Sequence, residues 1–107
     1  MTLHDRLKQD LAAALATRDL ETARVLRTLV AAIDNAAAVA PGPALGTVGA
    51  ADVPRRHIGE NEAMSIVRGE ADELAAAIAT YEAHDRRDAA ASLRSQLAVV
   101  DRYTAGR

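Results

Sequence analysis

Apolar residues recur every three or four positions in four separate segments of this chain. The first segment shows the pattern most simply, because leucine returns at every fourth position, at Leu3, Leu7, Leu11 and Leu15. Residues three or four apart lie on one face of an α-helix, so each segment predicts an amphipathic helix. The predicted helices are Leu3–Thr17, Leu20–Ala38, Asn61–Ala83 and Arg86–Thr104.

The short connections between these segments predict how the helices pair. Arg18 and Asp19 separate the first two helices, and the apolar pattern lapses only briefly around Asp85 between the last two. Amphipathic helices joined so closely lie antiparallel with their apolar faces together. We therefore predict an all-α fold, a four-helix domain made of two antiparallel helical hairpins, with Asp19 and Asp85 capping the second helix of each hairpin.

Residues 39–54 differ from the rest of the chain. All three prolines fall here, together with Gly42, Gly46 and Gly49, and charged residues are nearly absent. Proline interrupts helical hydrogen bonding, so this segment predicts a flexible loop between the hairpins. Since 107 residues suffice for one hydrophobic core, we expect residues 1–107 to form a single domain.

The apolar stripes also predict which side chains form the core. Their central members are Leu11, Leu26, Val30, Ile33, Leu74, Ile78, Leu93 and Leu97. We expect most of each of these side chains to be buried. If Leu97 is fully enclosed, its replacement by alanine should cost about 2–5 kcal/mol. Tyr81 and Tyr103 fall on the same stripes, which predicts core packing with each hydroxyl group at the rim.

Composition excludes several classes of function. There is no cysteine, so disulfides, thiolate metal sites and thiol nucleophiles are excluded. His4, His57 and His84 are scattered without the spacing of metal ligands, and we predict no metal, no cofactor and no catalytic residue. No apolar run approaches the length of a membrane span, so we expect a cytoplasmic protein that does not contact the membrane.

Two segments resemble the YqeY family, whose helical domain also occurs as the GatB/YqeY module of tRNA-dependent amidotransferases. The first is residues 19–36 and the second is residues 62–88. The polar positions that match in register are Arg27, Asn35, Tyr81, Glu82, Arg86 and Asp88. Family members usually continue into a smaller helical tail, whereas this chain ends at Arg107, so the resemblance covers the helical domain without that tail. Asp85 stands where the family usually has glycine.

The resemblance implies a function in tRNA handling. In amidotransferases the related region helps to hold misacylated tRNA, while glutaminase and activation chemistry reside in other domains. The family label is carbon–nitrogen ligase activity with glutamine as amido-N-donor. The resemblance therefore implies a non-catalytic, tRNA-associated module, and we do not expect this domain to catalyse a reaction alone. Its implied partners are tRNA or a tRNA-handling enzyme.

Five arginines are the candidate phosphate contacts: Arg18, Arg24, Arg27, Arg86 and Arg87. If the hairpins bring them together, they form a patch that binds the tRNA backbone. The alternative is that Arg27, Arg86 and Asp88 form ion pairs between helices. The formal charge of −2 provides no general attraction for nucleic acid, so a helical protein-interaction or self-association domain remains the alternative function.

Overall fold

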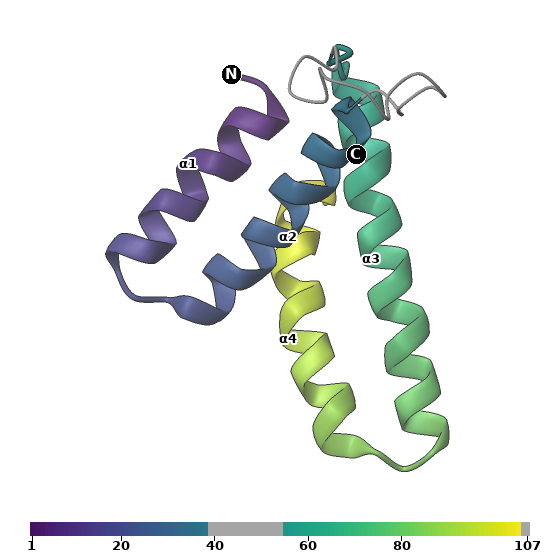
Figure 1. Cartoon of the computed structure of the whole chain (residues 1–107). Coiled ribbons are helices and arrows are strands. Elements are labelled where there is room, and N and C mark those ends of the chain that lie inside the picture. Colours follow the sequence, from purple (N-terminus) through teal and green to yellow (C-terminus); the bar gives the residue numbers. More distant parts are fainter. Residues whose placement is uncertain (39–54, 106–107) are drawn as a thin grey trace, which may run out of the picture.

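The computed structural model describes residues 1–38 and 55–105, and helices make up most of these ranges (Figure 1). They are α1 (Leu3–Ala16), α2 (Leu20–Ala37), α3 (Glu60–Ala83) and α4 (Arg87–Thr104). The described ranges contain no strand and only one isolated bridge, between Ala38 and Arg55. The predicted all-α fold is confirmed, with helix ends within one residue of those predicted. The predicted loop at 39–54 lies outside the described residues.

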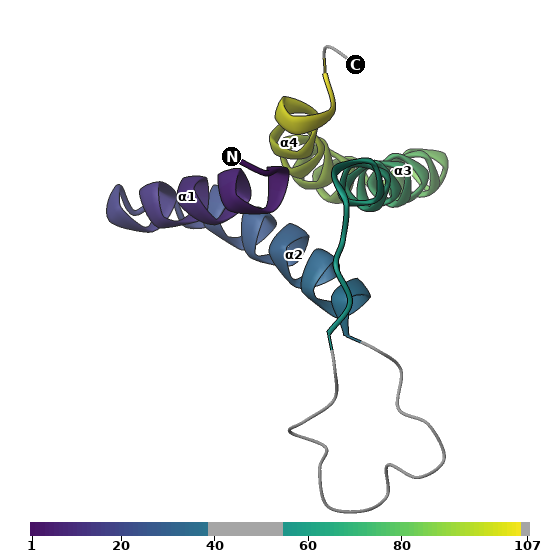
Figure 2. The same ribbon diagram turned by 90° about the horizontal axis from the view of Figure 1, so that it is seen from above.

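The helices form two antiparallel hairpins, as predicted. α1 packs along α2, and α3 packs along α4. α2 contacts α3 and α4 as well as α1, and α1 also contacts α3 (Figures 1 and 2). The α3–α4 pair is the longer hairpin, and its corner extends beyond the other pair (Figure 1). Among the described helices, none combines the length and low polarity needed to cross a bilayer.

The core lies where the two hairpins meet. The largest side chains with almost no exposed surface come from all four helices, and they are Leu7, Leu26, Leu29, Val67 and Val100. In the described ranges, no polar or charged residue is buried as a whole. An apolar core shared by all four helices indicates that burial of aliphatic side chains holds the hairpins together.

The predicted core list is partly correct. Leu26, Ile33 and Ile78 are buried, whereas the remaining members are only half-buried: Leu11, Val30, Leu74, Leu93 and Leu97. α2 covers only one end of the α3–α4 pair, and Leu93 lies on α4 nearer to the corner of that pair (Figure 1). Because Leu97 is not fully enclosed, the condition attached to its predicted 2–5 kcal/mol is not met.

Both hairpins turn through the same kind of corner. Arg18 and Asp85 have φ of 59° and 55°, in the left-handed region that favours glycine. The next residue in each case donates its N–H to the helix just ended, from Asp19 to the Ala14 carbonyl at 2.9 Å and from Arg86 to the Tyr81 carbonyl at 2.8 Å. This is the Schellman ending of a helix.

Side-chain caps distinguish the beginnings of the helices. Thr2 and Asp5 form a reciprocal capping box at α1, and Asp19 accepts a hydrogen bond from the Thr22 N–H at the start of α2. The prediction that Asp85 caps α4 is wrong. Asp85 instead has the left-handed backbone conformation that follows the end of α3. The N-cap of α4 is Arg86, whose side chain forms no capping hydrogen bond.

Gly69 lies in the interior of α3 and provides a first prediction. It is exposed, and a Cβ added there would meet no atom within 4 Å. Glycine costs about 1 kcal/mol relative to alanine within a helix, so Gly69→Ala should raise the free energy of unfolding by about that amount. Urea denaturation followed by circular dichroism measures it. If the free energy of unfolding of Gly69→Ala were unchanged or lower, the added methyl group would have to clash with a neighbour that the structure does not show.

Candidate functional site

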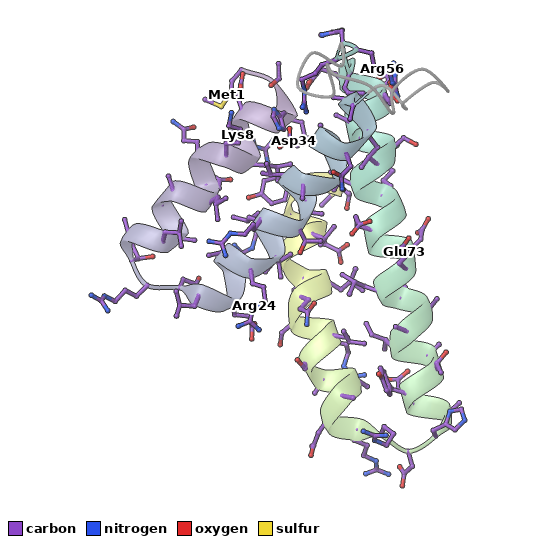
Figure 3. The ribbon with its side chains drawn as sticks, in the orientation of Figure 1. Met1, Lys8, Arg24, Asp34, Arg56 and Glu73 are labelled. Atoms are coloured by element: carbon purple, nitrogen blue, oxygen red, sulfur yellow. The ribbon has the colours of Figure 1, made fainter. Side chains whose placement is uncertain are left out.

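The first group of candidate arginines lies at and after the α1–α2 corner. Arg18 is the left-handed residue of the corner, and Arg24 and Arg27 follow in the first half of α2. All three are exposed, and Figure 3 shows Arg24 near the corner end of the helix. Within the described ranges none of them forms an ion pair. Their guanidinium groups are therefore available to solvent or to a ligand.

The second group lies at the α3–α4 corner. Arg86 and Arg87 are exposed, and the Arg86 guanidinium lies 5.8 Å from the centre of the Tyr81 ring. Arg87 Nε lies 3.1 Å from Asp85 Oδ1, in a pair so open to water that it contributes little to stability. No side chain caps α4, so the backbone N–H groups of its first turn face outward beside two positive charges.

The two groups do not form one patch. Each belongs to the corner of a different hairpin, and the corners lie apart (Figures 1 and 2). The alternative prediction is that ion pairs between helices involve Arg27, Arg86 and Asp88. The described residues contain no such ion pair. Arg94 on α4 pairs with Glu82 on α3 instead, and both side chains are about half exposed.

The other polar residues selected from the sequence are Asn35, Tyr81, Glu82 and Asp88, and they also divide between two places. Tyr81 and Glu82 lie in the last turn of α3, and Asp88 lies in the first turn of α4. These residues share the corner with Arg86. Asn35 lies near the other end of α2, next to Asp34, which Figure 3 labels far from Arg24. Tyr81 is exposed, with 37% of its surface accessible, so its predicted place in the core is wrong.

A cleft of about 390 Å³ lies where α1, α2 and the C-terminal end of α4 meet. The residues that line it are Arg6, Asp10, Ala13, Ala14, Thr17, Asp19, Thr22, Leu26, Arg102 and Tyr103. Sequence reasoning did not identify this cleft. Its residues come from three helices, and no local pattern indicates that the first and last helices meet.

Tyr103 lines this cleft and is itself buried. Its hydroxyl group donates a hydrogen bond to Asp10 Oδ2 at 2.6 Å, and the Arg6 guanidinium lies 5.0 Å from the centre of its ring. Burial raises the pKa of the Tyr103 phenol well above its usual value, and the hydrogen bond to Asp10 raises it further. The phenol therefore remains protonated and joins α4 to α1.

A second cleft, of about 270 Å³, lies near the opposite ends of α1 and α2. His4 Nε2 is 3.0 Å from Asp34 Oδ1, too poorly aligned for a hydrogen bond but close enough for an ion pair when the ring is protonated. The Leu3 N–H donates to the Glu60 carboxylate, with 3.0 Å to Oε2. These contacts join α1 to α2 and α3. The polar side chains of this cleft therefore hold the helices together.

A third, smaller groove of about 150 Å³ runs between α2, α3 and α4. Glu70 and Glu73 lie at its edge over an apolar floor that includes Leu29 and Val100. Partial burial raises the pKa of Glu70, and the neighbouring charge of Glu73 raises it further. Among the described residues, neither carboxylate forms an ion pair.

The side chains that could act chemically in this protein are charged groups, hydroxyl groups, amides and three histidines. The described residues contain no group of three or more histidine, aspartate or glutamate side chains arranged to hold a metal ion. Comparison with family models, curated proteins and solved structures finds no match to this chain. The arginine corners and the cleft around Tyr103 are therefore the features from which a function can be argued.

Proposed function

We propose that this protein is a non-catalytic, tRNA-associated helical module that resembles the GatB/YqeY appendage of glutamine-dependent tRNA amidotransferases. The observation that carries the proposal is the composition of the α3–α4 corner. Tyr81, Glu82, Arg86 and Asp88 match the family pattern and lie together there. Asp85 has φ of 55°, the conformation that glycine favours, and the family usually has glycine at this position.

The α3–α4 corner has suitable chemistry for a phosphate group. Arg86 and Arg87 are exposed beside the first turn of α4, where backbone N–H groups and the helix dipole attract anions. Asp85 and Asp88 lie at the same corner and oppose that attraction. We therefore expect weak contact with the tRNA backbone, with dissociation constants of micromolar order or weaker, as in non-specific binding.

Replacement of both corner arginines tests this proposal. In gel-shift titrations with total tRNA at several salt concentrations, Arg86→Ala/Arg87→Ala should weaken binding. The slope of log affinity against log salt should become shallower by about 2, because each neutralised phosphate contributes roughly one unit. The helical circular dichroism should not change, since neither side chain is buried.

A matched control is Lys8→Ala/Arg68→Ala, which removes the same charge from exposed positions on α1 and α3. It should keep the salt slope of the original protein. An equal loss in both variants would mean that only net charge matters. A third variant, Arg18→Ala/Arg24→Ala/Arg27→Ala, reports on the other corner. If it alone abolishes binding, the contact lies at α1–α2.

One observation favours the alternative function, a protein-interaction or self-association domain. Leu15 and Leu20 flank the α1–α2 corner with 44% and 62% of their surfaces exposed. Exposed leucines on both sides of a corner are suited to an apolar partner surface. The absence of tRNA binding at low salt, together with a stable dimer in analytical ultracentrifugation, would replace the tRNA proposal with this one.

A further inference from the structure

The cleft around Tyr103 contains charged groups that the fold does not fully use. Among the described residues, no ion pair joins Arg6 or Arg102 to a carboxylate. Arg6 lies over the Tyr103 ring, and both arginines line the cleft. A guanidinium group has five N–H donors, so each keeps donors for an oxyanion.

The two carboxylates of the cleft are only partly engaged. Asp10 accepts the Tyr103 hydroxyl through Oδ2, and Asp19 accepts the Thr22 N–H through Oδ1. The other oxygen of each carboxylate accepts no hydrogen bond from any described residue. Both negative charges therefore keep an acceptor for a cationic group on a ligand.

Apolar side chains lie among these charges. Leu26, Ala14 and Tyr103 line the cleft and are themselves buried, so they form its floor. A volume of about 390 Å³ is sufficient for a small molecule. The apolar floor favours a ligand with an apolar portion, whereas the four charged side chains that line the cleft favour charged groups on the same ligand.

We propose that this cleft binds a small zwitterion with one ammonium group, one carboxylate group and a short apolar side chain, as in a free α-amino acid. The carboxylate of the ligand pairs with Arg102 or Arg6, the ammonium group pairs with Asp19 or Asp10, and the side chain lies on the floor. A simple anion would face two carboxylates, and a simple cation would face two guanidinium groups. The zwitterion satisfies both signs of charge.

Matched ligands test the requirement for two charges. The probes are L-leucine, N-acetyl-L-leucine, which lacks the ammonium group, and L-leucinamide, which lacks the carboxylate. Backbone amide resonances of the full chain are followed during titration at constant ionic strength. Saturable shifts should appear for Thr22, Leu26 and Tyr103 with L-leucine, and each analogue should bind about tenfold more weakly or worse. Equal binding by N-acetyl-L-leucine would overturn the proposal in favour of an anion site. The absence of saturable shifts with L-leucine would overturn it altogether.

Matched variants locate the site. Arg102→Gln and Asp19→Asn each remove one charge, and asparagine still caps α2, so both chains should fold. Each should weaken L-leucine binding about tenfold or more. Arg68→Gln and Asp72→Asn make the same changes at exposed positions on α3 and should bind as the original protein does. Unchanged binding in Arg102→Gln and Asp19→Asn would show that the zwitterion lies elsewhere.

This test is independent of the tRNA proposal. Arg102 and Tyr103 are near the C-terminal end of α4, whereas Arg86 and Arg87 are at its beginning. Arg86→Ala/Arg87→Ala should therefore leave the L-leucine titration unchanged. A loss in that variant would contradict the placement of the zwitterion site.

Discussion

Leu26→Ala is expected to lower the free energy of unfolding by about 2–5 kcal/mol. The Leu26 side chain is 1% exposed and belongs to the core shared by the two hairpins. Its truncation removes apolar contacts and leaves a cavity that surrounding helices can fill only by moving. Urea denaturation followed by circular dichroism measures the change. Because small domains have only about 5–15 kcal/mol of stability, the loss should be a large fraction of the total.

Leu20→Ala is the matched control. It makes the same substitution at the start of α2, where Leu20 is 62% exposed, and surface changes usually stay within about 0.5 kcal/mol. The two variants thus compare the same chemical change inside and outside the core. A similar effect at both positions would mean that α2 does not pack as described.

Tyr103→Phe is expected to lower the free energy of unfolding by about 1–2 kcal/mol. It removes the hydroxyl group that donates to Asp10 Oδ2 at 2.6 Å and leaves the aromatic ring in place. Asp10 is half-buried beside an open cleft, so water can replace part of the lost hydrogen bond. Because water can reach Asp10, we expect a loss in the free energy of unfolding near the lower limit for a hydrogen bond to a charged group.

Alkaline pH provides a second measure of the same contact. The Tyr103 pKa is raised by folding, so the stabilisation is complete below the pKa of an unfolded tyrosine, about 10. It is lost as the pH rises through that value toward the folded pKa, because only the unfolded phenol ionises there. Tyr103→Phe has no phenol at this position, and its stability should fall less steeply above pH of about 10.

Tyr81→Phe is the control for the stability measurement. The Tyr81 hydroxyl forms no hydrogen bond with another described residue, and the side chain is exposed. Its free energy of unfolding should stay close to that of the original protein. If Tyr81→Phe and Tyr103→Phe behave alike, the contact with Asp10 contributes nothing measurable.

The positions of the helices could be predicted from the sequence because the patterns that define a helix are local. Leucine at every fourth position in α1, and the acidic and hydroxyl residues at Thr2, Asp5 and Asp19, act within one or two helical turns. Asp85 was misassigned because aspartate is favoured both as an N-cap and, among non-glycine residues, at left-handed positions. Only the backbone conformation distinguishes the two roles.

The site was harder to predict because it depends on how the hairpins cross. The five arginines could form one patch only if the hairpins brought their corners together. Arg18 and Arg86 belong to the corners of different hairpins, and these corners lie apart (Figure 1). Leu93 and Leu97 are only half-buried. Helical periodicity identifies the apolar face of each helix, but it does not say how far along that face a second hairpin reaches.

The hydrogen bond between Asp10 and Tyr103 joins positions 93 residues apart, and it therefore bears on the order in which the chain folds. Each hairpin closes through a short corner, which requires only local contacts and little loss of loop entropy. The Asp10–Tyr103 bond requires both hairpins to be docked, so it belongs to the last step of assembly. By the same reasoning, separation of α1 from α4 breaks this bond before either hairpin must open.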